Sequence, residues 1–218
     1  EANTDFTGGS GELEAITEDV WLSTSGNDSS SGLSESEAFL TLNRALSLIY
    51  PVPESPVTIN IAEGIYSPSN TGWTFPIFLI NNINLVGAGE ELTIIDAEGT
   101  GTVIIFYEQD NITISHISIN GGAAERGGGV SVIGSSPTLI NVTISENTAD
   151  IFGGGIYVSS SDPTFTNVTI NGNMAKNGGG MFLISSNPIL TDVTISGNTA
   201  KYGGGLNLSF SSPVLIHV

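Results

Sequence analysis

FGGGIYVSSSDPTFTNVTINGN occupies residues 152–173, and NGGGMFLISSNPILTDVTISGN occupies residues 177–198. The two segments share a glycine triplet, a proline and a final asparagine, and they begin 25 residues apart. Self-similarity at a fixed period of roughly 20–50 residues is the signature of a repeat architecture, in which neighbouring units stack and close each other's core. The two segments therefore predict a solenoid.

The same markers recur through the C-terminal half of the chain. Glycine triplets follow one another at intervals of 26, 25 and 25 residues, a proline follows each triplet at one fixed offset, and an asparagine stands before three of them. These asparagines are predicted either to form an internal amide ladder or to sit in turns with left-handed backbone. The residues predicted to carry the structural repeat are Gly127, Gly128, Gly129, Gly153, Gly154, Gly155, Gly178, Gly179, Gly180, Gly203, Gly204, Gly205, Asn147, Asn173 and Asn198, together with Pro137, Pro163, Pro188 and Pro213.

Apolar residues alternate with polar ones inside each unit, as in a β-strand with one buried face. Val130 and Val132 form one such pair, and Val142 and Ile144 form another after the turn. Because these runs are short and separated by Gly, Ser, Asn and Pro, each unit is predicted to be one coil of about three strands. Stacked coils lie about 4.8 Å apart, so equivalent residues should stand directly above one another.

The N-terminal part of the chain keeps the strand pattern but loses the markers. Residues 57–67, 83–99 and 102–122 are predicted to form irregular early coils. Residues 34–50 predict the one helix, with a capping box, a proline after its end and one apolar face, which should cover the first coil. The capping box is Ser34 with Glu37, the proline is Pro51, and the apolar face is Phe39, Leu42, Leu46 and Ile49.

Three regions follow from this reading of the chain. Residues 1–19 are predicted to be an N-terminal leader or an assembly arm, and residues 20–56 an N-terminal strand with the capping helix. Residues 57–218 are predicted to form the parallel β-helix. The chain stops at SSPVLIHV, inside a coil, so we expect either that the protein continues or that a neighbouring subunit covers the open end. Head-to-tail covering would produce a filament.

Charge and composition narrow the classes of partner. Twenty-two acidic side chains stand against four basic ones, which gives a net charge of −18 and disfavours nucleic acid and anionic lipid as partners. The chain has no cysteine, which excludes thiol catalysis and cysteine zinc sites. No stretch approaches the roughly 18 apolar residues of a membrane helix, so this segment is not expected to span a membrane.

The residues offer little for catalysis. His116 and His217 lie in ordinary strand contexts, and Asp110, Asp150, Asp162 and Asp192 belong to different columns of the repeat. A general acid and base need two titrating groups in one site whose pKa values are driven apart. No catalytic residue, metal ligand or cofactor is predicted, and the sequence leaves calcium binding open.

One candidate binding patch emerges from the register of the coils. Tyr157 and Phe182 hold the same outward position in consecutive coils, between Ser131 and Asn207. Two stacked rings can hold the face of a sugar, which makes this pair the nominated carbohydrate site. Aromatic pairing between coils is the competing interpretation.

The chain also resembles a known superfamily. DVWLSTSGNDSSSGLSESEAFLTLNRAL, VTINIAEGIYS, NLVGAGEELTIIDAEG and GGGIYVSSSDPTFTNVTINGNMA are similar to segments of bacterial right-handed parallel β-helix proteins of the pectin-lyase-like superfamily, over about residues 19–218. Secreted and cell-surface repeat proteins resemble it most. The resemblance implies an all-β, right-handed parallel β-helix of about 25-residue coils and an extracellular or cell-surface location.

The resemblance specifies the fold but not the function, because the superfamily includes lyases, hydrolases and adhesins. The leading hypothesis is a non-enzymatic, structural or adhesin-like extracellular module with a carbohydrate or another cell-surface partner. The alternatives are a subunit of a head-to-tail extracellular filament and the N-terminal part of a polysaccharide lyase or hydrolase.

Overall fold

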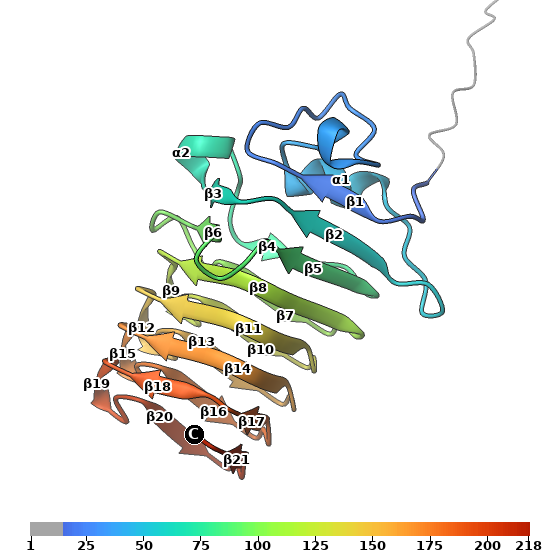
Figure 1. The fold of residues 1–218 in the computed structure, drawn as a ribbon. Helices are drawn as coiled ribbons and strands as arrows, with labels where there is room; N and C mark the ends of the chain where they lie inside the picture. The colour runs from blue at the N-terminus through green and yellow to red at the C-terminus, as the bar shows by residue number, and fades with distance from the viewer. Residues whose placement is uncertain (1–14) are drawn as a thin grey trace, which may run out of the picture.

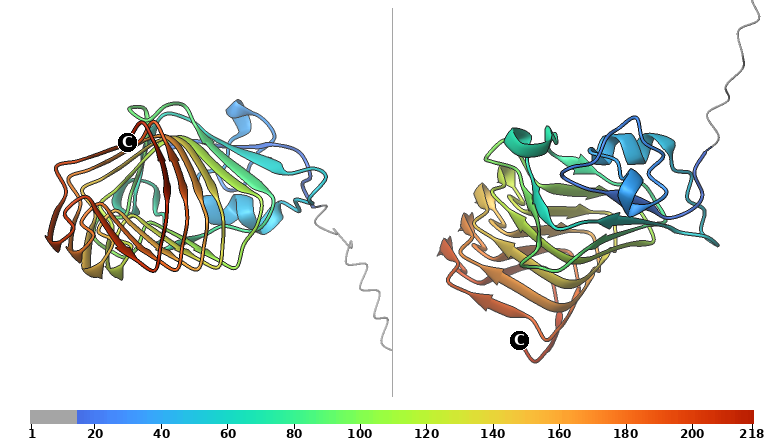
Figure 2. Two further views of the ribbon diagram at one scale, coloured as in Figure 1. Left: turned by 90° about the horizontal axis from the view of Figure 1, so that it is seen from below. Right: turned by 45° about the horizontal axis from the view of Figure 1, so that its top comes forward.

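Parallel strands stack coil upon coil from the N-terminal end of the molecule to the last residues of the chain (Figure 1). The computed structural model describes residues 15–218. All pairings between the strands of its sheets are parallel, which confirms the predicted all-β solenoid. Seen along the stack, successive coils lie over one another (Figure 2).

Three sheets form the sides of the stack. An 11-stranded sheet contains β1 (Val20–Leu22), β2 (Val57–Ile61), β3 (Gly64–Tyr66), β5 (Ile83–Gly87), β6 (Thr93–Asp96), β8 (Ile112–Asn120), β11 (Thr138–Ser145), β14 (Thr164–Asn171), β17 (Ile189–Thr191), β18 (Thr194–Ser196) and β21 (Val214–Ile216). A six-stranded sheet contains β4 (Ile77–Phe78), β7 (Ile104–Tyr107), β10 (Val130–Ile133), β13 (Ile156–Ser159), β16 (Met181–Ile184) and β20 (Leu206–Ser209). The smallest sheet contains β9 (Ala123–Arg126), β12 (Thr148–Phe152), β15 (Met174–Asn177) and β19 (Thr199–Tyr202).

Equivalent residues of successive units stand in vertical columns. Ile156 pairs with Val130 on one side and with Met181 on the other. In the interior, Leu139, Phe165 and Leu190 form one fully buried column. The repeated sequence therefore exists because each coil supplies the wall that its neighbour lacks.

Every regular coil turns at four positions with left-handed backbone. Their φ angles lie between 50° and 65°, and the positions recur every 25 or 26 residues. Only one of the four columns consists of glycine alone, so most of these turns are not marked by a constant residue in the sequence. The four columns are His116, Asn141, Asn167, Asp192 and His217; Gly121, Glu146, Gly172 and Gly197; Gly127, Gly153, Gly178 and Gly203; and Gly134, Ser160, Ser185 and Phe210.

Two polar ladders run through the interior at these turns. Asn147 donates from Nδ2 to Oδ1 of Asn173 at 3.0 Å, and Asn173 donates in the same way to Asn198 at 3.0 Å. Asn147 and Asn173 are fully buried. The asparagines thus form the internal amide ladder, and the left-handed residue precedes each of them in the chain.

A serine ladder occupies another corner, just before the repeated prolines. The Oγ of Ser161 accepts from the backbone N–H of Ser135 at 3.1 Å, and the Oγ of Ser186 accepts from that of Ser161 at 3.2 Å. All three serines are buried. The repeated serine of SSP, SDP and SNP therefore joins consecutive coils, a role that the sequence analysis did not recognise.

The second glycine of the first three triplets is required by close packing of the backbone. A Cβ on Gly154 would lie 2.4 Å from the carbonyl oxygen of Met174 and 2.5 Å from that of Gly179. Both atoms belong to the backbone of the next coil, so a side chain here would force the coils apart.

The predicted helix over residues 34–50 is wrong in extent and in its cap. The structure has a 3-10 turn, η1 (Glu35–Glu37), and a shorter helix, α1 (Leu42–Leu48), whose N-cap is Thr41. Ser34 makes no side-chain capping bond. A second short helix, α2 (Pro68–Thr71), lies in the first coil.

Competing contacts explain why the helix starts late. Phe39 forms a parallel bridge with Leu22 at the edge of β1, and the Asp28 carboxylate accepts from the backbone N–H groups of Leu40 and Thr41 at 2.9 and 2.8 Å. These bonds hold residues 39–41 extended. The predicted apolar face still points inward, because Phe39, Leu42 and Ile49 are buried and Leu46 packs against the core.

The two ends of the described chain differ. The proposed leader lies mostly outside the described residues, but Ile16 bridges to Ile49 and Asp19 accepts from the backbone N–H of Thr58 at 2.8 Å. At the other end, apolar side chains of the last coil are exposed, among them Phe210 at 91%.

Candidate binding site

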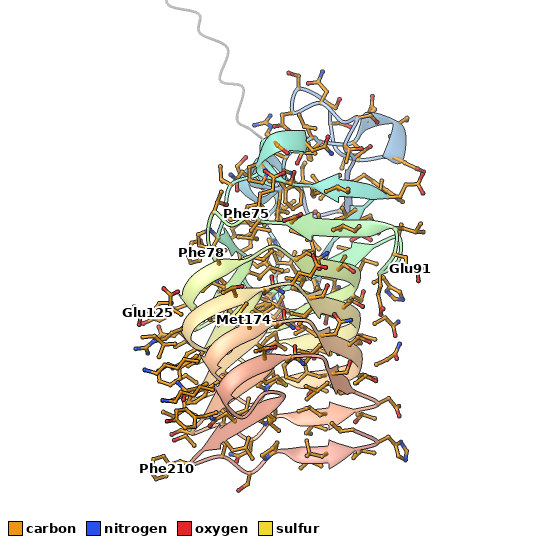
Figure 3. The ribbon with its side chains drawn as sticks, turned by 90° about the vertical axis from the view of Figure 1, so that its left-hand side faces the viewer. Phe75, Phe78, Glu91, Glu125, Met174 and Phe210 are labelled. Atoms are coloured by element: carbon orange, nitrogen blue, oxygen red, sulfur yellow. The ribbon has the colours of Figure 1, made fainter. Side chains whose placement is uncertain are left out.

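The nominated aromatic pair lies where the four-stranded and six-stranded sheets meet. Tyr157 is on β13 and Phe182 on β16, and the two residues are register partners, as predicted. The glycine triplet at 153–155 joins β12 to β13, so the end of β12 lies next to these rings. In Figure 3 this edge of the stack extends between the labels of Glu125 and Phe210.

The two rings stack, but they are covered. Their centroids are 6.0 Å apart with planes 10° from parallel. The ring of Phe152, at the end of β12, packs 4.4 Å from that of Phe182 and 6.4 Å from that of Tyr157. As a result Tyr157 is only 6% exposed and Phe182 only 7%. The pairing between coils is thus present, whereas sugar stacking on these two faces stays a prediction.

Arg126 covers the aromatic cluster of Phe152, Tyr157 and Phe182 from the side of β9. Its guanidinium carbon lies 5.5 Å from the ring centroid of Phe152 and 5.9 Å from that of Tyr157, within the range of a cation–π contact. The neighbouring Tyr157 hydroxyl raises the pKa of Arg126 above its usual value, and a second partner, Glu125, lies 3.2 Å from Nε. The side chain is still 50% exposed, so it has donors available for a ligand.

The cluster belongs to a longer column of residues that each precede a glycine triplet. The register places Arg126, Phe152, Asn177 and Tyr202 one above another. Tyr202 is 52% exposed, and Nζ of Lys201 lies 5.0 Å from its ring centroid. We call the surface formed by Arg126, Phe152, Lys176, Lys201 and Tyr202 the aromatic–basic ridge.

Sequence reasoning found only part of this surface. It placed Tyr157 and Phe182 in one column but missed Phe152, which covers them. The sequence did contain a signal for this surface, since Arg126, Phe152 and Tyr202 each stand directly before a glycine triplet. Three of the four basic residues of the chain, Arg126, Lys176 and Lys201, fall on the same small sheet.

The histidines lie elsewhere, in the left-handed column of the 11-stranded sheet. The ring Nε2 of His116 is 2.8 Å from Nδ2 of Asn141, and Asn141 accepts from Asn167 at 2.8 Å. His217 contacts Asp192 at 3.1 Å on an exposed surface. Each histidine therefore takes part in a contact between neighbouring coils.

Within residues 15–218 no three His, Cys, Asp or Glu side chains come together in a way that could hold a metal ion. Across the same residues, no helix is both long and apolar enough to cross a bilayer.

Solved structures share the fold of this chain at low sequence identity. A pectin methylesterase variant in complex with a hexasaccharide matches with a TM-score of 0.52 and 16% identity, over 92% of this chain and 67% of its own. The pectin methylesterase of Erwinia chrysanthemi matches with a TM-score of 0.44 and 13% identity, over 82% of this chain and 66% of its own. The chain thus spans about two thirds of the length of these enzymes. No curated protein matches it.

The first of these matches supports the pectin-lyase-like, right-handed β-helix fold and, at 16% identity, nothing beyond the fold. A family profile described as a protein of unknown function, DUF1565, matches residues 24–212, which is most of the chain. The protein therefore belongs to the DUF1565 family, with a pectin-lyase-like parallel β-helix as its fold.

Proposed function

We propose that this chain is a non-enzymatic, extracellular β-helical module that binds carbohydrate at the aromatic–basic ridge. The observation that carries the proposal is the placement of Arg126 over Phe152 and Tyr157, with half of its side chain exposed. A guanidinium fixed on aromatic rings loses little freedom when it binds, and it offers a planar set of donors to hydroxyl or carboxylate oxygens.

The rest of the ridge suits an elongated ligand. Tyr202 provides an exposed ring in the same column, and Lys176 and Lys201 provide cations beside it. Aromatic rings bind the apolar faces of sugars while nearby polar groups bind their hydroxyls. In a chain with a net charge of −18, the four-stranded sheet carries three basic side chains against two acidic ones, Glu125 and Asp150, so its balance of charge differs from that of the chain as a whole.

Binding to a panel of immobilised neutral and acidic polysaccharides tests the proposal. We expect at least one polysaccharide to retain the protein, and we expect Arg126→Gln and Tyr202→Ala each to weaken that binding about fivefold or more, the order of one lost charged or stacking contact. Tyr107→Ala is the matched control, because Tyr107 is 55% exposed but lies on β7, outside the ridge.

The same preparations separate binding from catalysis. Incubation with each polysaccharide should release neither reducing sugar, unsaturated product nor methanol. Turnover by the unmodified chain would contradict the non-enzymatic assignment. Binding that is unchanged in both ridge variants would contradict the assignment of the site.

The exposed last coil favours a second candidate, a head-to-tail filament. Leu208 and Leu215 are 47% and 49% exposed, although their register partners Leu183 and Leu190 are fully buried, and a further coil or a second copy would cover them. In the filament, the mass measured by light scattering should rise with concentration, and Leu208→Asp should abolish the rise. A mass equal to one chain at all concentrations would exclude self-assembly of this segment.

A further inference from the structure

A groove of about 410 Å³ lies near the N-terminal end of the stack, on elements other than those of the ridge. Trp21 on β1, Asn60 on β2 and Val86 on β5 are neighbours in one register row of the 11-stranded sheet and line its floor. Glu35 in η1 and Glu63 after β2 complete its wall. The volume is typical of small-ligand sites, which span roughly 300–1,000 Å³.

The groove combines an aromatic surface with oxygen acceptors. Asn60 donates from Nδ2 to the carbonyl of Val20 at 3.4 Å, and no residue between 15 and 218 donates to its Oδ1, which is an acceptor available to a ligand. Glu35 and Glu63 are exposed and form no ion pair with any residue between 15 and 218. The indole of Trp21 is half-buried, so part of its face stays accessible.

This chemistry selects for a ligand rich in donors and free of negative charge. A carboxylate accepts hydrogen bonds from the hydroxyls of a sugar strongly, because the acceptor is ionised. The same carboxylates repel a uronic acid, and Glu35 and Glu63 have no cation beside them in the groove lining. An indole face packs against the C–H face of a sugar ring.

We infer that this groove is a second binding site, for an uncharged sugar unit packed on Trp21 and bound through Glu35, Glu63 and Asn60. The inference does not depend on the aromatic–basic ridge, since the two sites share no residue. The groove is acidic and the ridge is basic, so the two sites should prefer different sugars.

Tryptophan fluorescence can test the site directly. The chain has two tryptophans, and Trp73 is 4% exposed and packed against Tyr66, so a ligand in the groove should change the emission of Trp21 alone. Titrations use cellohexaose, xylohexaose and mannohexaose as neutral probes, with hexagalacturonate as the acidic one. We expect at least one neutral probe to shift the emission with saturation and hexagalacturonate to leave it unchanged.

Substitutions that preserve the fold complete the test. Glu63→Gln should weaken the neutral probe about tenfold, because it removes one charge-assisted hydrogen bond. Trp21→Phe should abolish the fluorescence change while calorimetry still detects weakened binding. Tyr202→Ala should leave the titration unchanged, because Tyr202 belongs to the ridge. The test of binding at the groove is therefore independent of the test of binding at the ridge.

The inference is overturned by any of three results. The first is that no neutral hexasaccharide changes the emission or gives heat. The second is that hexagalacturonate binds as well as the neutral probe. The third is that Glu63→Gln, shown to be folded by circular dichroism, binds as tightly as the unmodified protein.

Discussion

The early coils and the regular coils of this molecule reach the same fold by different contacts. The early coils, residues 57–122, rely on bonds that occur once, such as that from Nε1 of Trp73 to the carbonyl of Leu40 at 3.1 Å. The Tyr66 hydroxyl donates to the carbonyl of Ala62 at 3.0 Å, and Tyr66 packs against Trp73. The regular coils, residues 123–218, repeat the same amide, serine and glycine contacts at each level.

Repeated contacts and contacts made once have different structural consequences. A contact between identical residues can be made again by the next coil, so ladders extend a stack without a fixed length. A contact made once fits a single level and joins the stack to the lid formed by β1, η1 and α1. A change in a ladder residue should therefore disturb two neighbouring coils, whereas a change in the early coils should act locally.

The largest effect is expected from Gly154→Ala. The new Cβ would meet two backbone oxygens at 2.4 and 2.5 Å, and the coils could relieve the clash only by separating. We expect a loss of at least about 3 kcal/mol in the free energy of unfolding, measured by urea denaturation.

Gly204→Ala is the matched control, because Gly204 holds the same place in the last coil and its Cβ would meet nothing closer than 3.2 Å. It should cost less than about 1 kcal/mol. If both substitutions lowered the free energy of unfolding equally, the close approach between coils would not be the reason for glycine at this position.

A smaller effect is expected from Asn173→Ala. The substitution removes the acceptor of the backbone N–H of Asn147 at 3.0 Å and leaves this buried donor without a partner, while Nδ2 of Asn147 keeps its bonds to the carbonyls of Ile119 and Ser145. An unsatisfied buried group costs about 1–3 kcal/mol, and the bonds of the Asn173 side chain to Asn147 and Ile144 are lost as well, so we expect a loss of about 3 kcal/mol by urea denaturation.

Asn171→Ala serves as the control in the same coil. Asn171 is half-buried on the outer side of β14, and its removal should change the free energy of unfolding by less than about 0.5 kcal/mol. If Asn171→Ala lowered the free energy of unfolding as much as Asn173→Ala, the amide ladder would not stabilise the fold more than an ordinary surface contact does.

The smallest effect is expected from Asp28→Ala, which tests the lid. The carboxylate accepts from the backbone N–H groups of Leu40 and Thr41 and from the Thr41 hydroxyl at 2.7 Å. We expect a loss of about 2 kcal/mol, confined to the lid. Hydrogen exchange should accelerate in residues 39–48 and stay unchanged in β11 and β14. Faster exchange throughout the stack would show that the lid and the regular coils unfold as one unit.

The periodicity of the sequence is sufficient to predict the solenoid, its register and its buried columns. Periodicity decides these features, because glycine, proline and asparagine at a constant interval fit only a chain whose equivalent residues are stacked. The alternation around Val142 and Ile144 likewise identified which residues face inward, and both are buried.

Which side chains are exposed on the outer surface depends on contacts that the repeat does not predict. The sequence predicted that Tyr157 and Phe182 face outward, but only the turn at Gly153 brings Phe152 across them and buries both rings. The helix began late because Asp28 and Leu22, distant in sequence, hold residues 39–41 extended. The groove at Trp21 is lined by residues of β1, β2 and β5, which are far apart in the sequence. A repeat fixes what lies above each residue, whereas the angle of each turn fixes what lies beside it.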